Sequence, residues 1–177
     1  LAVQQNVLSN INLFEKVKNI NPKIKIIIAS SIYAESSFGG IYGITKSMLE
    51  DVSKHYLECI GLQITVIRIG SVYGDLFDDN SLPIKLLKQR SPGVEINPKM
   101  RREYIYIDDV VEVIASIDKK SNGIYRLRGK KSYGIYDLLK ITNYKGCSQF
   151  ISNKAKDAYI EIEKESTAND IFIKESM

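Results

Sequence analysis

Three side chains in the first third of the sequence have types and spacings suited to moving a proton. Ser31 ends the run Ile26-Ile27-Ile28-Ala29-Ser30, and Tyr42 and Lys46 follow it by 11 and 15 residues. A tyrosine four residues before a lysine shares one face of a helix with it. A phenol has a pKa of about 10, and a nearby ammonium favours the phenolate and lowers that pKa. With the Ser31 hydroxyl donating to the reacting oxygen, the set predicts proton transfer between an alcohol and a ketone.

This chemistry also moves a hydride, which no side chain carries, so the site requires a hydride-carrying cofactor. The spacing Tyr-x-x-x-Lys is weak evidence by itself, because it recurs at Tyr136 and Lys140. No serine-tipped apolar run precedes that second pair, which is interpreted as part of an ordinary amphipathic helix.

The elements that must position these side chains follow from the apolar pattern. The β-branched run over residues 24–29 predicts a buried strand of a parallel sheet, and Leu62 to Ile69 predicts a second. Residues 42–60 predict the helix that carries Tyr42 and Lys46, ended by Gly61. Its expected buried residues are Met48, Leu49, Val52, Cys59 and Ile60. Since ligands bind outside the carboxyl ends of parallel strands, the three side chains are expected to meet there.

Further elements are expected on both sides of this region. Residues 3–18 predict a helix on which Asn6 is interpreted as an exposed residue. The later elements are a helix at 81–90, an extended piece at 94–96, a strand at 104–107, a helix at 110–117 capped by Asp108 or Asp109, a strand at 123–129 and a helix at 135–142.

Composition excludes several classes of function. The net charge of +4 is spread without a basic stripe, which argues against a nucleic-acid partner. There is no apolar run of 18 residues, so no membrane span is predicted, and no signal peptide is visible. Cys59 and Cys147 lack metal-ligand spacing and are interpreted as reduced thiols, which predicts a cytoplasmic protein and no metal site.

Four segments, in order, carry a resemblance to a known group of enzymes. They are Ala29-Ser30-Ser31, Tyr42-Gly43-Ile44-Thr45-Lys46, Arg68-Ile69-Gly70-Ser71-Val72-Tyr73-Gly74 and Arg102-Glu103-Tyr104-Ile105-Tyr106-Ile107-Asp108-Asp109. Together they resemble the extended branch of the short-chain dehydrogenase/reductase superfamily, the NAD-dependent sugar-nucleotide epimerases and dehydratases. The resemblance runs from about residue 6 to about residue 140.

The resemblance implies an α/β fold, a partial Rossmann-like doubly wound parallel sheet with a small C-terminal α+β substrate lobe. Residues 1–75 would form the catalytic part of the NAD(P)-binding domain. Residues 76–177 would form mainly the substrate lobe, truncated at its end, with some return to the sheet. The full-length protein is expected to be a homodimer.

The resemblance also implies roles for single residues. Tyr42 would be the acid/base, Lys46 would lower its pKa and hold the nicotinamide ribose, and Ser31 would contact the reacting oxygen. Ser30 and Ile69 would join Tyr42 and Lys46 in contacting the cofactor, NAD or NADP. The substrate would be a nucleotide sugar, contacted by Ser71 and Arg102.

The sequence departs from the family pattern in ways that leave alternatives open. The 177 residues contain no Gly-x-x-Gly-x-x-Gly turn to hold a pyrophosphate, so tight NAD binding by this chain alone is not expected. Ser71 stands where relatives usually have asparagine. The strand tip Ser31-Ile32-Tyr33 has no acid, which favours an epimerase or reductase over a dehydratase. The alternative is a non-catalytic Rossmann-like binding or assembly protein, against which the intact Ser-Tyr-Lys set argues.

Overall fold

The computed structural model describes residues 1–36, 39–74, 101–117, 122–134 and 137–138. These residues fall into two compact units. Unit 1 contains Leu1–Ile69 and Ser116–Leu127, and unit 2 contains Gly70–Ala115 and the described residues from Arg128 onward. The prediction that residues 1–75 are catalytic and residues 76–177 mainly bind substrate concerns function, and it stays a prediction.

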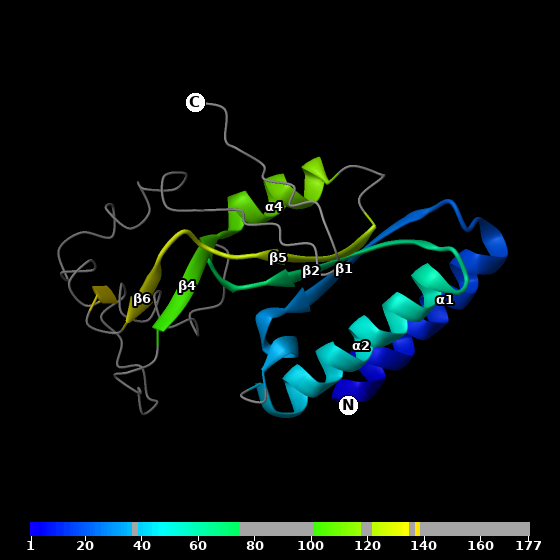
Figure 1. Ribbon diagram of the computed structural model, residues 1–177, viewed down its shortest axis with the longest axis horizontal. Helices are drawn as coiled ribbons and strands as arrows, with labels where there is room; N and C mark the ends of the chain where they lie inside the picture. The colour runs from blue at the N-terminus through cyan, green and yellow to red at the C-terminus, as the bar shows by residue number, and fades with distance from the viewer. Residues whose placement is uncertain (37–38, 75–100, 118–121, 135–136, 139–177) are drawn as a thin grey trace. The chain divides into compact units, whose positions relative to one another are not determined.

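Unit 1 is built on a parallel three-stranded sheet, as the two apolar runs predict. The strands β1 (Lys25–Ser31), β2 (Gln63–Ile69) and β5 (Gly123–Leu127) lie in the order β1-β2-β5 (Figure 1). Ser31 pairs with Ile69, and Ile69 with Leu127, so the three strands end level with one another. This common carboxyl edge is where ligands bind in such sheets.

Two long helices lie side by side against one face of this sheet (Figure 1). A π-helical segment η1 (Gln4–Leu8) continues directly into α1 (Ser9–Ile20), and α2 (Gly40–Glu58) follows the short 3₁₀ segment η2 (Ile32–Glu35). Apolar side chains from α1, α2, β1 and β2 form one core between the helices and the sheet. They are Phe14, Val17, Ile26, Ile28, Leu49, Tyr56, Leu62, Ile64 and Val66.

The structure corrects two predictions about buried surfaces. Along β1, Ile26 and Ile28 face the core, whereas Ile27 points to the opposite face and is 36% exposed, because neighbouring strand residues alternate sides. Met48 on α2, and Cys59 and Ile60 directly after its end, are exposed rather than buried. The buried residues of α2 are Gly43, Thr45, Leu49, Glu50, Ser53 and Tyr56.

Unit 2 contains a second small sheet. The strand β4 (Arg101–Tyr106) pairs in parallel with β3 (Ser71–Tyr73) and antiparallel with β6 (Ser132–Gly134). The core of this unit is rich in tyrosine, with Tyr73, Tyr104, Tyr106 and Leu138 buried together.

The helix α4 (Ile107–Ser116) follows β4 directly, three residues earlier than predicted. Asp108 and Asp109 therefore lie in its first turn rather than at the N-cap position. Carboxylates in a first turn still interact favourably with the helix dipole, which explains an acidic pair there.

Some predictions lie outside the described residues. They are the helix at 81–90, the extended piece at 94–96 and the pair Tyr136 and Lys140; of the helix at 135–142 only residues 137–138 are described, and both are helical. In the part of the chain that the structure describes, no helix combines the length and apolarity needed to cross a membrane.

Candidate active site

The carboxyl end of β1 presents two serines whose hydroxyls have different partners. Ser30 is 5% exposed, and its hydroxyl donates to the carboxylate of Glu50. Ser31 is 6% exposed, and its Oγ accepts a hydrogen bond of 3.3 Å from the backbone N–H of Tyr33, which caps η2. Because that contact uses Ser31 Oγ as an acceptor, its own hydrogen can still be donated to another oxygen.

The first turns of α2 bring Lys46 beside Tyr42. Lys46 Nζ lies 5.7 Å from the centroid of the Tyr42 ring and donates to the carbonyl oxygen of Ala29 at 2.9 Å. The lysine therefore joins α2 to the last residues of β1. Burial lowers the pKa of the Lys46 ammonium, and the Glu50 carboxylate opposes this shift. Tyr42 is 46% exposed, so its phenol is accessible.

Tyr33 links the serine end of β1 to the tyrosine of α2. Its backbone N–H bonds Ser31, and its ring meets the Tyr42 ring edge to face at a centroid distance of 6.5 Å. The backbone of η2 lies so close to α2 that a Cβ at Gly43 would be 2.4 Å from the Tyr33 carbonyl oxygen. A Cβ at Gly39 would be 2.7 Å from Tyr33 Cβ. Glycine at these two positions permits the close approach that sets Tyr42 beside η2.

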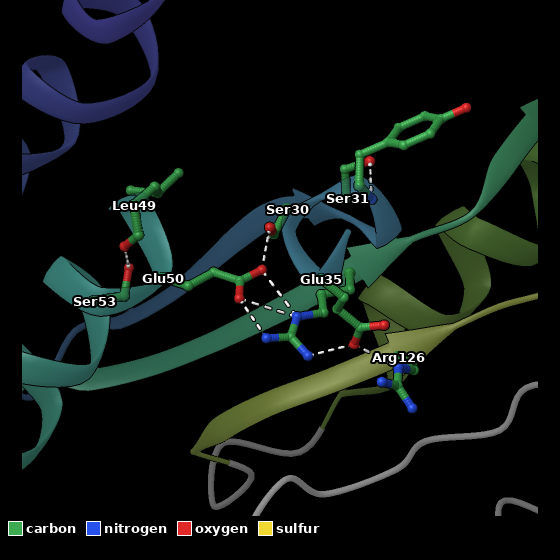
Figure 2. A network of polar contacts seen from close by, with 9 residues as sticks. Ser30, Ser31, Glu35, Leu49, Glu50, Ser53 and Arg126 are labelled. Carbon is green, nitrogen blue, oxygen red and sulfur yellow. Dashed lines mark hydrogen bonds and ion pairs between the residues drawn. The ribbon is translucent and has the colours of Figure 1, made fainter. Parts of the chain in front are cut away.

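A network of charged groups lies beside these residues, and the sequence pattern does not predict it (Figure 2). Arg68 on β2 binds both carboxylate oxygens of Glu50, through Nε at 3.1 and 3.0 Å and Nη2 at 2.6 Å. Arg68 also binds Glu35 of η2, which accepts a second ion pair from Arg126 Nε at 2.6 Å. The available signal was a glutamate one turn after Lys46 and an arginine inside an apolar strand.

The environment of Asn6 also differs from the prediction. The helical pattern predicts an exposed residue, but Asn6 is half-buried and its side-chain amide donates to Thr45 Oγ1 at 3.0 Å. Thr45 in turn donates to the carbonyl oxygen of Tyr42 at 2.9 Å. A chain of hydrogen bonds therefore runs from η1 to the backbone of the candidate acid/base.

The remaining predicted residues divide between the units. Ile69 lies in unit 1 directly opposite Ser31 in the sheet register. Ser71 and Arg102 lie in unit 2, on β3 and β4; Ser71 pairs with Tyr104, and Arg102 is half-buried. Ser31, Tyr42 and Lys46 thus share unit 1, while both predicted substrate contacts belong to unit 2. Among the described residues, no group of three histidine, cysteine, aspartate or glutamate side chains is arranged to hold a metal ion.

The amino-acid sequence of this chain is similar to those of known epimerases. The chain is 28% identical over 181 residues to the UDP-glucuronate 4-epimerase of Thermodesulfobacterium geofontis, covering 92% of this chain and 54% of that protein. It is 30% identical over 161 residues to UDP-glucuronate 4-epimerase 1 of Arabidopsis thaliana, covering 77% of this chain and 38% of that protein. The chain thus spans about half the length, or less, of the curated relatives it matches.

Solved structures with a similar fold include epimerases. The UDP-N-acetylglucosamine 4-epimerase from Methanobrevibacter ruminantium M1, in complex with UDP-N-acetylmuramic acid, matches with a TM-score of 0.68 and 25% identity. The match covers 78% of this chain and 51% of that one. The predicted Rossmann-like α/β class with a parallel sheet is therefore confirmed. The sequence model of the NAD dependent epimerase/dehydratase family matches residues 2–127. The chain belongs to the NAD dependent epimerase/dehydratase family.

Proposed function

We propose that this chain is the catalytic portion of an NAD-dependent 4-epimerase acting on a UDP-sugar. The observation that carries the proposal is the contact set of Lys46, which lies over the Tyr42 ring and donates to the end of β1. This contact places a positive charge beside the ring of the residue proposed as acid/base. Relatives that match over most of this chain are UDP-sugar 4-epimerases, which supports this substrate class.

The proposed mechanism assigns one task to each residue. Tyr42 accepts the proton of the sugar hydroxyl at its phenolate oxygen while that hydroxyl is oxidised to a ketone, and returns the proton when the ketone is reduced. Lys46 holds its ammonium beside the Tyr42 ring and binds the nicotinamide ribose. Ser31 donates its hydroxyl hydrogen to the reacting oxygen, since its Oγ is otherwise an acceptor. When bound, the cofactor would supply the hydride acceptor and donor that no side chain provides.

The residues present fit one end of the cofactor. The ammonium of Lys46 lies near the carboxyl end of β1, with the Tyr42 ring beside it, where a nicotinamide ribose would bind. The Ser30 hydroxyl is already used on Glu50, so we expect Ser30 to contact the cofactor through its backbone, with Ile69 beside it. A glycine-rich turn for the pyrophosphate is absent from the 177 residues, so we expect no micromolar NAD affinity of this chain by itself.

Residues 1–75 then act as the catalytic part, and residues 76–177 mainly as the substrate lobe. Arg102 would bind the nucleotide diphosphate and Ser71 would donate a hydrogen bond to it, as charge-assisted contacts favour. We propose that the whole protein is a cytoplasmic homodimer without nucleic-acid partners.

The experiment compares Tyr42→Phe with Tyr56→Phe in the polypeptide that carries this chain. Both lose one phenol from α2, but the Tyr56 hydroxyl bonds Glu15 rather than the candidate site. We expect Tyr42→Phe to lower UDP-sugar turnover by at least about 100-fold, with nearly unchanged NAD affinity, and Tyr56→Phe to keep turnover. Turnover of Tyr42→Phe within threefold of the parent contradicts the mechanism and favours a non-catalytic binding protein.

A further inference from the structure

Glu50 and Arg68 are a buried ion pair for which the proposed mechanism has no use. Glu50 is 4% exposed and Arg68 is 7% exposed. Arg68 contacts both oxygens of the carboxylate, and the Ser30 hydroxyl donates to the same group (Figure 2). Burying a charge is costly unless it is paired and hydrogen-bonded, and a hydrophobic pair would pack there without that cost. The buried pair therefore indicates that α2 must be held in one orientation relative to the sheet.

The pair lies one helical turn beyond Lys46 and repeats its connection. Lys46 ties α2 to the carbonyl of Ala29, and Glu50, four residues later, ties α2 to the hydroxyl of Ser30. Two neighbouring residues at the end of β1 are thus bound by two side chains on one helix face. The Lys46 contact is a single hydrogen bond from a flexible side chain. Glu50 makes the more rigid contact, because Arg68 holds its carboxylate from β2 with a planar guanidinium.

The same arginine extends the connection to the segment before Tyr42. Arg68 also binds Glu35, which is fixed from the other side by Arg126. Glu35 ends η2, the segment whose Tyr33 carries the contacts to Ser31 and to the Tyr42 ring. All three candidate catalytic residues are therefore attached to elements that meet at Arg68.

We propose that Glu50, held by Arg68, is a positioning residue: it fixes α2 against the end of β1 and so sets Tyr42 and Lys46 relative to Ser31. The inference rests on the proposed function for its kinetic consequence but not for its geometric one.

The test uses two variants of Glu50 and a matched control. Glu50→Gln keeps the size of the side chain but loses the charge opposite Arg68. Glu50→Asp keeps the charge and shortens the side chain by one methylene, so it can still pair with Arg68 and is the variant expected to fold in every case. Asp51→Asn is the control, because it removes one carboxylate from the next position of α2, where the side chain is exposed.

Two measurements are made on each folded variant. The first is the rate of Lys46 acetylation in the 177-residue chain, relative to that of exposed Lys54 on the same helix. The second is kcat and the KM for NAD and UDP-sugar in the polypeptide that carries the chain. We expect Glu50→Asp to raise the acetylation ratio at least threefold and to lower kcat at least tenfold. The KM for UDP-sugar should stay close to that of the parent, because its proposed contacts Ser71 and Arg102 belong to unit 2. The urea midpoint of unfolding should also stay close to that of the parent, and Asp51→Asn should change neither the acetylation ratio nor the kinetic constants.

The two readouts separate this inference from the proposed function. If the parent turns over UDP-sugar and Glu50→Asp retains kcat within threefold, the positioning role is wrong while the proposed function stands. If the parent shows no turnover, the proposed function fails and the acetylation ratio decides alone. An unchanged ratio in Glu50→Asp then overturns the positioning role, and a threefold rise supports it. If Glu50→Gln does not fold, the result for Glu50→Asp decides between these outcomes.

Discussion

Gly43 provides a direct test of how closely η2 and α2 approach. It lies inside α2, one residue after Tyr42, where glycine normally costs about 1 kcal/mol relative to alanine. An alanine Cβ would lie 2.4 Å from the Tyr33 carbonyl oxygen, about 1 Å short of ordinary contact. Forcing a methyl into such a packed position costs about 1–3 kcal/mol. We expect Gly43→Ala to lower the free energy of unfolding by about 1 kcal/mol, because the clash exceeds the gain in helix propensity.

The assay is urea unfolding of the chain followed by far-ultraviolet circular dichroism, with near-ultraviolet spectra for the tyrosine contacts. Gly61→Ala is the control: Gly61 has φ of +83° and open space at its Cβ position, so alanine there adds backbone strain of about 1–2 kcal/mol without a clash. Only Gly43→Ala should also change the tyrosine signal, since Tyr33 must move away from Tyr42. Stabilisation by Gly43→Ala of about 1 kcal/mol, the gain in helix propensity alone, would refute the close approach.

Three further outcomes are expected. Phe14→Ala should lower the free energy of unfolding by about 3–5 kcal/mol in urea titrations, because Phe14 is fully buried in the core of unit 1. Burial lowers the pKa of Lys46, so the unfolded chain binds more protons at this group than the folded chain does. The free energy of unfolding should therefore rise as the pH increases through the lowered pKa towards 10.5. Urea unfolding curves at several pH values should show this rise in the parent and not in Lys46→Met. The hydrogen bond to Glu15 raises the pKa of Tyr56, so this bond contributes fully to the free energy of unfolding below pH 10 and less as the pH rises through the raised pKa. Unfolding curves of Tyr56→Phe should show no such loss of stability at alkaline pH.

The features that local sequence specifies were predicted well. The strands β1 and β2 and the helix α2 follow from apolar runs and a glycine stop, and the structure places them within a few residues of the predicted bounds. The sequence also predicts Lys46 near the carboxyl end of β1, and the structure has it donating to Ala29. The roles of Ser31, Tyr42 and Lys46 stay predictions. The conformation of η2 was not, since it depends on Glu35 binding arginines from two other strands.

The buried face of α2 shows why the charged network was missed. Apolarity predicted a stripe through Met48 and Ile60, yet both are exposed and Thr45, Glu50 and Ser53 are buried. Each of the first two buried polar groups has a partner that its own helix pattern cannot reveal: Thr45 has Asn6, and Glu50 has Arg68 and Ser30. A hydrophobic pattern finds a buried face only where burial requires apolar residues. Here α2 uses two buried positions, Thr45 and Glu50, for polar contacts to other elements, while Leu49 and Tyr56 pack in the apolar core.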